Sequence, residues 1–124
     1  MTKPLGLFLY ENLMPGSQLA NRLQDLGYRV QVVGDARLLV SQAIEEKPML
    51  VVIDLACQRV NVCDVIKELR QNPATSHMPV LAFTNHSNTA MQTAAREAGA
   101  TLVAAEEAML VQLPQLLDQV LEIE

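Results

Sequence analysis

Residues 49–54 read Met-Leu-Val-Val-Ile-Asp, five apolar side chains followed by a carboxylate. An unbroken apolar run of this length after a proline is typical of a parallel β-strand that is buried on both faces of a sheet. Open α/β sheets bind their ligands at the carboxyl ends of such strands. The stretch therefore predicts an α/β fold, with Asp54 at the edge of the sheet where chemistry is expected.

Similar apolar runs alternate with helical patterns along the rest of the chain. Strands are predicted at residues 5–10, 28–33, 49–53, 79–83 and 101–104. Helices are predicted at residues 15–26, 36–46, 62–71 and 88–98, with a fifth over the leucine-rich C-terminal segment. Asp35 is a candidate N-cap for the second helix, while Gly27 and Gly99 are placed to end the first and the fourth. Pro114 fits the last helix only if it lies in the first turn.

Five strand–helix units with strands that are apolar almost throughout call for a parallel sheet covered by helices on both faces. Right-handed crossovers then give a doubly wound, flavodoxin-like (βα)5 sandwich, whose simplest strand order is 2-1-3-4-5. Residues 1–124 are predicted to form one domain, without an internal repeat or a linker.

Charge and composition argue against several classes of function. The net charge is −5 and the Lys and Arg residues are scattered, whereas a nucleic-acid surface needs clustered cations to contact phosphates. No apolar run approaches the roughly 18 residues of a membrane span. We therefore expect a cytoplasmic protein that binds neither nucleic acid nor membrane. The two cysteines, Cys57 and Cys63, fall short of the four ligands of a structural zinc site.

Several landmarks together resemble a known family. They are Leu26-Gly27-Tyr28 after the first helix, Asp54 at the end of the third strand, the fourth strand from Pro79 to Thr84, and Ala98-Gly99-Ala100 before the fifth strand. Over nearly the whole chain, the order and lengths of the elements are similar to the receiver domain of bacterial two-component response regulators, the CheY-like superfamily. The resemblance implies the same fold and a role in signal transduction.

The resemblance also implies an altered phosphorylation site. Asp54 matches the family's phospho-acceptor, and Thr84 matches the Thr or Ser that ends its fourth strand. The family's two adjacent acidic residues, which hold Mg²⁺ at the end of strand one, are matched by Tyr10-Glu11, so one carboxylate is missing. The family's Lys, seven residues beyond the strand-five Gly, is matched by Glu106. A carboxylate there would repel both the acceptor and a phosphoryl group.

The predicted phospho-acceptor pocket is therefore degenerate and consists of Asp54, Glu11, Thr84 and Glu106. The loop at residues 55–62 also lacks the family's Met-Pro and Asp-Gly pairs. Glu11 and Asp54 alone would bind Mg²⁺ only weakly. If Glu11, Asp54 and Glu106 converge, their like charges would raise at least one pKa or attract a divalent cation. Otherwise they are solvated side chains, or are capped by backbone amides.

We accordingly expect a stand-alone pseudo-receiver that is not an enzyme, needs no cofactor and signals by binding another protein. The alternative is a single-domain response regulator that accepts a phosphoryl group on Asp54 with the help of Mg²⁺. A third reading is a sensor that binds a small ligand in the same crevice. The partner implied by the resemblance is a histidine kinase or another signalling protein.

In the family, partners and second copies dock on the face built by helix four, strand five and helix five, which here corresponds to residues 88–124. Apolar residues beside charged ones often mark such contacts. The candidates for a partner interface or a homodimer interface are Met91, Ala95, Met109, Leu110 and Val111.

Cys57 and Cys63 allow two interpretations. They are six residues apart and close to the predicted pocket, as a redox switch would require. In the other interpretation Cys63 is a small apolar residue that begins the buried face of the third helix.

Overall fold

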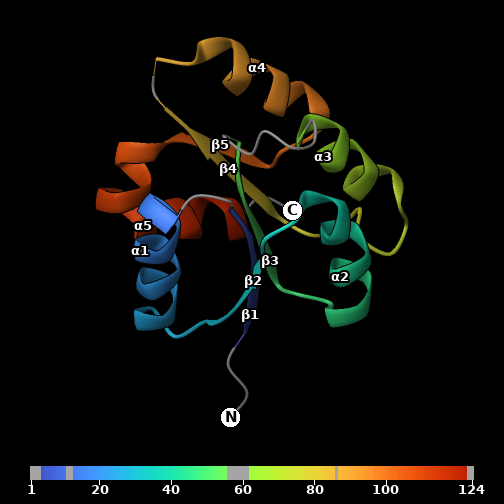
Figure 1. Ribbon diagram of the computed structural model, residues 1–124, viewed down its shortest axis with the longest axis horizontal. Coiled ribbons are helices and arrows are strands. Elements are labelled where there is room, and N and C mark those ends of the chain that lie inside the picture. The colour runs from blue at the N-terminus through green and yellow to red at the C-terminus, as the bar shows by residue number, and fades with distance from the viewer. Residues whose placement is uncertain (1–3, 11–12, 56–61, 86, 123–124) are drawn as a thin grey trace.

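Three apolar runs form the centre of a five-stranded parallel sheet (Figure 1). The computed structural model describes residues 4–10, 13–55, 62–85 and 87–122. The strands are β1 (Leu5–Leu9), β2 (Arg29–Val33), β3 (Leu50–Asp54), β4 (Val80–Thr84) and β5 (Leu102–Ala105). Their order is β2-β1-β3-β4-β5, which confirms the predicted topology. The central strands are buried along their whole length, whereas the edge strand β2 exposes part of its surface.

Four strands begin one residue later than predicted, because their limits are set by pairing with neighbouring strands and not by apolarity alone. Pro79, for example, has no N–H to give to a ladder, and only its carbonyl takes part, accepting from the N–H of Val51 at 3.0 Å. At their other ends β3, β4 and β5 extend one residue further than predicted. Asp54 and Thr84 are therefore the last residues of strands and not the first residues of loops.

Helices cover both faces of the sheet. They are α1 (Leu13–Asp25), the 3₁₀ turn η1 (Ala36–Leu38), α2 (Leu39–Glu46), α3 (Val62–Gln71), α4 (Thr89–Ala98) and α5 (Glu106–Glu122). Asp35 caps η1, since its carboxylate accepts from the N–H of Arg37 at 2.9 Å, so the predicted second helix opens with a 3₁₀ turn. Gly99 ends α4 with a left-handed φ of 117°. In the described part of the chain, no helix is long and apolar enough to cross a membrane.

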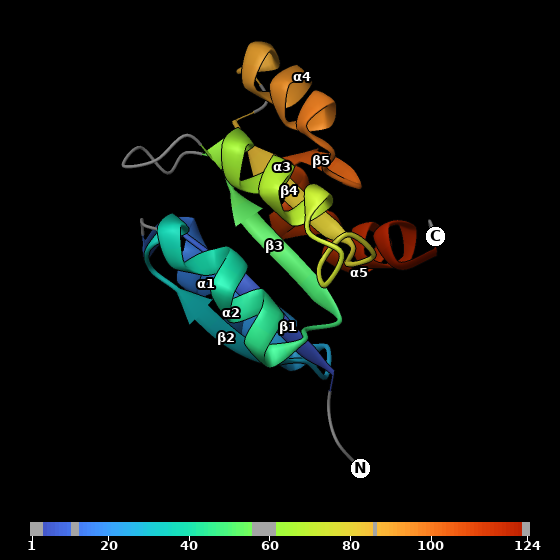
Figure 2. The ribbon, with the colours of Figure 1, turned by 90° about the vertical axis from the view of Figure 1, so that its right-hand side faces the viewer.

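The helices divide the core into two layers. Helices α1 and α5 lie on one face of the sheet, and α2, α3 and α4 lie on the other (Figures 1 and 2). Successive residues of a strand point to opposite faces. Val52 of β3 accordingly packs in the α1 and α5 layer, while Val51 and Ile53 pack in the other.

Helix α5 is interrupted near its middle. Gln112 has a non-helical backbone, with φ −116° and ψ 23°, and Pro114 follows two residues later. Pro114 therefore lies near the start of a second helical segment, where its missing N–H breaks no hydrogen bond. This arrangement confirms the prediction that the proline requires a first turn.

Arg70 ties two loops together at the end of α3. Its guanidinium donates to the backbone oxygens of Gly99 at 2.6 Å, Ser76 at 2.8 Å and Met78 at 2.9 Å, and to the hydroxyl of Thr101 at 2.6 Å. That hydroxyl in turn accepts from the first N–H of β4 at 3.0 Å. Burial lowers the pKa of Arg70, and no carboxylate among the described residues forms an ion pair with it. The loops that lead into β4 and β5 are thus held by one side chain.

Candidate functional site

Asp54 is fixed at the carboxyl edge of the sheet by the strand that carries it. It pairs with Phe83 of β4, and the ladder continues one step further, where the N–H of Leu55 donates to the carbonyl of Phe83 at 2.9 Å. Its exposed fraction is only 4 %. A buried carboxylate on a paired backbone has little freedom to move, so its position is set by the fold and not by a loop.

Thr84 and Glu106 follow Asp54 across the edge of the sheet. Thr84 is the last residue of β4, pairs with Ala105 of β5, and is 5 % exposed. Glu106 comes directly after Ala105 and is the first residue of α5. Neighbouring strands lie about 5 Å apart, so Thr84 is one strand from Asp54, and Glu106 is two strands away, at about 10 Å across the sheet.

The local setting of Glu106 favours a carboxylate for a structural reason. Glu106 and Glu107 occupy the first turn of α5. The N-terminus of a helix has unpaired N–H groups and a partial positive charge, which stabilise acidic side chains. Glu106 is half-exposed, so water also solvates it. The helix can therefore accommodate a negative charge where the family resemblance implies a positive one.

Part of the predicted pocket lies outside the described residues. This applies to Glu11 and to most of the loop that follows β3, including Cys57. The predicted Mg²⁺ pair of Glu11 and Asp54, and the convergence of Glu11 with the other acids, therefore stay predictions. Within residues 4–10, 13–55, 62–85 and 87–122, no group of three or more His, Cys, Asp or Glu side chains could hold a metal ion.

Tyr10 takes part in packing next to the acidic edge. Its half-buried ring meets the ring of Phe8 edge-on, with centroids 5.0 Å apart and planes at 73°. Phe8 in turn meets Phe83 at 6.1 Å and 84°. Edge-to-face contacts of this kind are favourable for aromatic rings. The residue that matches one of the family's metal-binding acids is thus part of an aromatic cluster, whose third ring, Phe83, comes from a different strand.

The predicted partner surface is only partly exposed. Met109 and Ala95 are fully buried, so these two cannot contact a partner directly, and their inclusion in the predicted interface was wrong. Met109 belongs to the stripe that α5 turns toward the sheet, and Ala95 lets α4 approach the sheet closely. Met91 and Leu110 are half-buried, and Val111 is 74 % exposed. The exposed apolar group on this face is therefore smaller than predicted.

Cys63 is buried at the start of α3, as its interpretation as a core residue predicted. Burial raises the pKa of its thiol, so the reactive thiolate is disfavoured at neutral pH. His77 is exposed in the loop before β4. It lines two shallow cavities at the amino-terminal end of the sheet, opposite to Asp54.

A further cavity lies between the end of α1 and the second half of α5. Its walls come from two segments that are almost ninety positions apart, Leu26 with Tyr28 and the stretch from Pro114 to Leu121. The sequence analysis missed this cavity because no local pattern links segments that only the packing of α1 against α5 brings together.

Comparison with known proteins gives concordant results. Residues 14–114 match the family model described as the response regulator receiver domain. A protein from Chloroflexus aurantiacus described as a response regulator has a similar structure, with 21 % identity and a TM-score of 0.90 over 98 % of this chain and 99 % of that one. The chemotaxis protein CheY4 of Vibrio cholerae has 18 % identity and a TM-score of 0.84 over 96 % of this chain and 99 % of its own.

A third similar structure is the receiver domain of the sensor histidine kinase PA1611 from Pseudomonas aeruginosa, which holds a magnesium ion in its active-site cleft. It has 19 % identity and a TM-score of 0.87 over 98 % of this chain and 99 % of that one. No curated protein was found to match the sequence.

Proposed function

This chain belongs to the response regulator receiver domain family, and from that premise we propose that it is a pseudo-receiver, which transmits a signal through protein contacts without phosphorylation of Asp54. Receiver domains are signalling modules that interact with histidine kinases and other signalling proteins. The proposal treats residues 1–124 as one such domain, acting in the cytoplasm and without a cofactor.

Glu106 is the observation that supports the proposal most. Phosphoryl transfer to a carboxylate requires cations or metal ions that neutralise the negative charge on the phosphoryl oxygens. At the position where the family supplies a Lys, this chain begins α5 with a carboxylate. The sign of the field at that position is therefore reversed, which disfavours a second negative group next to Asp54.

Tyr10 supports the same proposal. A pair of adjacent acids would hold Mg²⁺ at the end of β1, but the ring of Tyr10 packs against Phe8 instead. A phenol in an apolar contact cannot replace a carboxylate as a ligand of a hard cation. Asp54 and Thr84 keep the positions that the alternative function, a phosphorylatable receiver, requires.

For the partner contact we propose the face formed by α4, β5 and α5. Val111 is its most exposed apolar residue, and it lies directly before the interruption of α5 at Gln112. Half-buried Met91 and Leu110 extend the surface. An apolar centre with a polar rim is typical of transient protein interfaces, and the same face would serve a homodimer.

The test measures the thermal midpoint with and without millimolar Mg²⁺ plus beryllofluoride, a phosphoryl mimic. A working acceptor at a hundredfold excess over Kd gains about 2.7 kcal/mol, or about 10 °C for a domain of this size. We expect no measurable shift in the wild type or in Asp54→Asn. A shift of several degrees in the wild type that Asp54→Asn abolishes would refute the proposal and identify a functional phospho-acceptor.

A charge-reversal pair makes the experiment sharper. Glu106→Lys should gain some response to Mg²⁺ and beryllofluoride, because it restores a cation at the carboxyl edge. Glu107→Lys makes the same charge change one position along α5 and serves as the matched control. Equal responses of the two variants would show that net charge matters and that position 106 does not, which would remove the main support for the proposal.

A further inference from the structure

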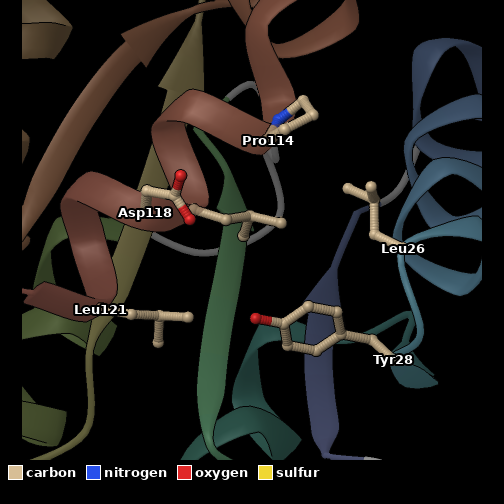
Figure 3. A pocket seen from close by; sticks show the side chains of 6 residues that line it. Leu26, Tyr28, Pro114, Asp118 and Leu121 are labelled. Atoms are coloured by element: carbon tan, nitrogen blue, oxygen red, sulfur yellow. The ribbon is translucent and has the colours of Figure 1, made fainter.

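The residues that line the cavity between α1 and α5 do not include Asp54, Thr84 or Glu106 of the candidate functional site. Figure 3 shows Leu26 and Tyr28 on one side and Pro114, Asp118 and Leu121 on the other. The volume is about 210 Å³, and the walls are mostly aliphatic and aromatic. A cavity with apolar walls and a few convergent polar groups is the usual form of a binding site in proteins.

Two polar groups at this cavity are available to a ligand. The hydroxyl of Tyr28 points across the cavity toward α5, and the carboxylate of Asp118 is on the opposite wall (Figure 3). Burial, and then the charge of Asp118, raise the pKa of Tyr28, because the negative charge of Asp118 disfavours a phenolate nearby. Within the described chain, neither side chain makes a hydrogen bond or an ion pair. The cavity thus offers an aromatic ring and an unneutralised carboxylate.

The α5 wall of the cavity is negatively charged, whereas the exposed residues Arg22 and Arg29 are close in the chain to Leu26 and Tyr28 of the opposite wall. Residues 97–124 contain no Lys or Arg, and Asp118 is the acidic residue of α5 that lines the cavity. None of the six residues that line the cavity is cationic. A ligand with a positive charge and a hydrocarbon stem is complementary to both features, since the stem can pack on the leucines while the cation meets the carboxylate and the ring face.

The apolar surface extends beyond the cavity. Leu121 also lines a second cavity of about 280 Å³, whose walls include Pro48, Met49 and Pro79. Leu26 at one end of this surface is 41 % exposed, and Met49 at the other end is 54 % exposed. We call the surface from Leu26 through Leu121 to Met49 the apolar band. Because the apolar band includes two cavities that share Leu121, it suits a protein segment better than a small amine.

We propose that the apolar band docks a basic amphipathic helix of a protein partner, with one Lys or Arg side chain inserted between Tyr28 and Asp118. The apolar face of the helix would cover Leu26, Leu121 and Met49. The site lies at the opposite end of the sheet from Asp54. It therefore does not depend on whether Asp54 is phosphorylated, and it differs from the face around Val111.

The test uses a synthetic amphipathic peptide of Leu and Lys, and a second peptide with Glu in place of Lys. Amide NMR shifts of the isotopically labelled full chain report the site, and titration gives the Kd. The Lys peptide should shift the amides of Leu26, Tyr28, Met49 and Leu121, and the Glu peptide should not. Asp118→Asn should weaken binding about tenfold, because it removes a charge-assisted contact.

Glu68→Gln removes the same charge from an exposed position on α3, on the other face of the sheet, and should leave the Kd unchanged. Leu26→Lys, which puts a cation at the rim, should reduce binding as much as Asp118→Asn. The proposal is overturned if the Lys peptide does not bind or if its shifts centre on Val111. Equal effects of Asp118→Asn and Glu68→Gln, or equal affinity for the Glu peptide, would also overturn it. Thermal midpoints near that of the wild type show that the variants fold.

Discussion

Replacing Arg70 with methionine should lower the free energy of unfolding more than replacing any exposed charged residue does. Methionine keeps an unbranched apolar stem but removes the guanidinium that donates to Gly99, Ser76, Met78 and Thr101. Water can take over the exposed contact with Ser76. The other acceptors are partly buried, and they lose a charged donor that methionine cannot replace.

The magnitude follows from those three partly buried contacts. Each hydrogen bond contributes about 1 kcal/mol net, so the expected loss is about 3 kcal/mol. Burial lowers the pKa of Arg70, which shows that holding its charge there has a desolvation cost that methionine avoids, and the figure is therefore an upper estimate. For a chain of 124 residues, this loss corresponds to a decrease of about 11 °C in the thermal midpoint.

Urea unfolding is the appropriate assay, because a change in midpoint at constant slope isolates stability from changes in the unfolded state. Arg70→Lys keeps the positive charge and tests whether the planar guanidinium, with its several N–H groups, is required. An ammonium group cannot donate in the three directions that the guanidinium serves, so about two thirds of the loss should remain. Arg37→Met is the control, since Arg37 pairs with Asp35 at a side-chain exposure of 70 % and its loss should change little. If Arg70→Met is no more destabilising than Arg37→Met, the guanidinium does not hold the loops.

Two further predictions use backbone and titration chemistry. Gly99→Ala should lower the unfolding free energy by more than about 1 kcal/mol, because Gly99 has a φ of 117° and a Cβ there would lie 2.6 Å from a side-chain carbon of α3. Gly34→Ala, with open space around it, is the matched control and should be neutral, and equal urea midpoints for the two would contradict the argument. Burial and Asp118 raise the pKa of Tyr28 above its ordinary 10.0, so this group's contribution to stability is complete below pH 10.0 and is lost as the pH rises through the folded-state pKa. Asp118→Asn should lower that pKa, as followed by ultraviolet absorbance of the phenolate in a Tyr10→Phe background, and an unchanged titration would show that the two groups do not interact.

Much of the candidate site could be predicted because it depends on strand ends. In a parallel sheet, every strand delivers its last residue to the same edge, so Asp54 and Thr84 were predictable neighbours once five strand–helix units were recognised. The finer limits were not predictable. Pairing moved the starts of four strands by one residue, and an apolar pattern contains no information on which neighbour supplies a hydrogen bond.

The predicted interface was less successful, for a reason specific to α5. Met109, Leu110 and Val111 are consecutive and equally apolar, so composition alone could not rank them. Their exposures range from fully buried Met109 to mostly exposed Val111. The rotation of a helix about its own axis is fixed by the surface that it packs against, and the interruption at Gln112 resets that rotation within the helix.

The sequence by itself determined the fold class, the strand order and the residues at the carboxyl edge of the sheet, including Glu106 in place of a cation. The fold class and the strand order follow from local periodicity and from the handedness of crossovers, whereas the role of position 106 follows from the resemblance to receiver domains. Only the tertiary structure decided that Arg70 joins two loops, that Phe8 packs on Phe83, and that Tyr28 faces Asp118 across a cavity. Each of these contacts joins residues from different parts of the fold, and their proximity is set by how whole helices and strands pack, which no segment of the chain specifies alone.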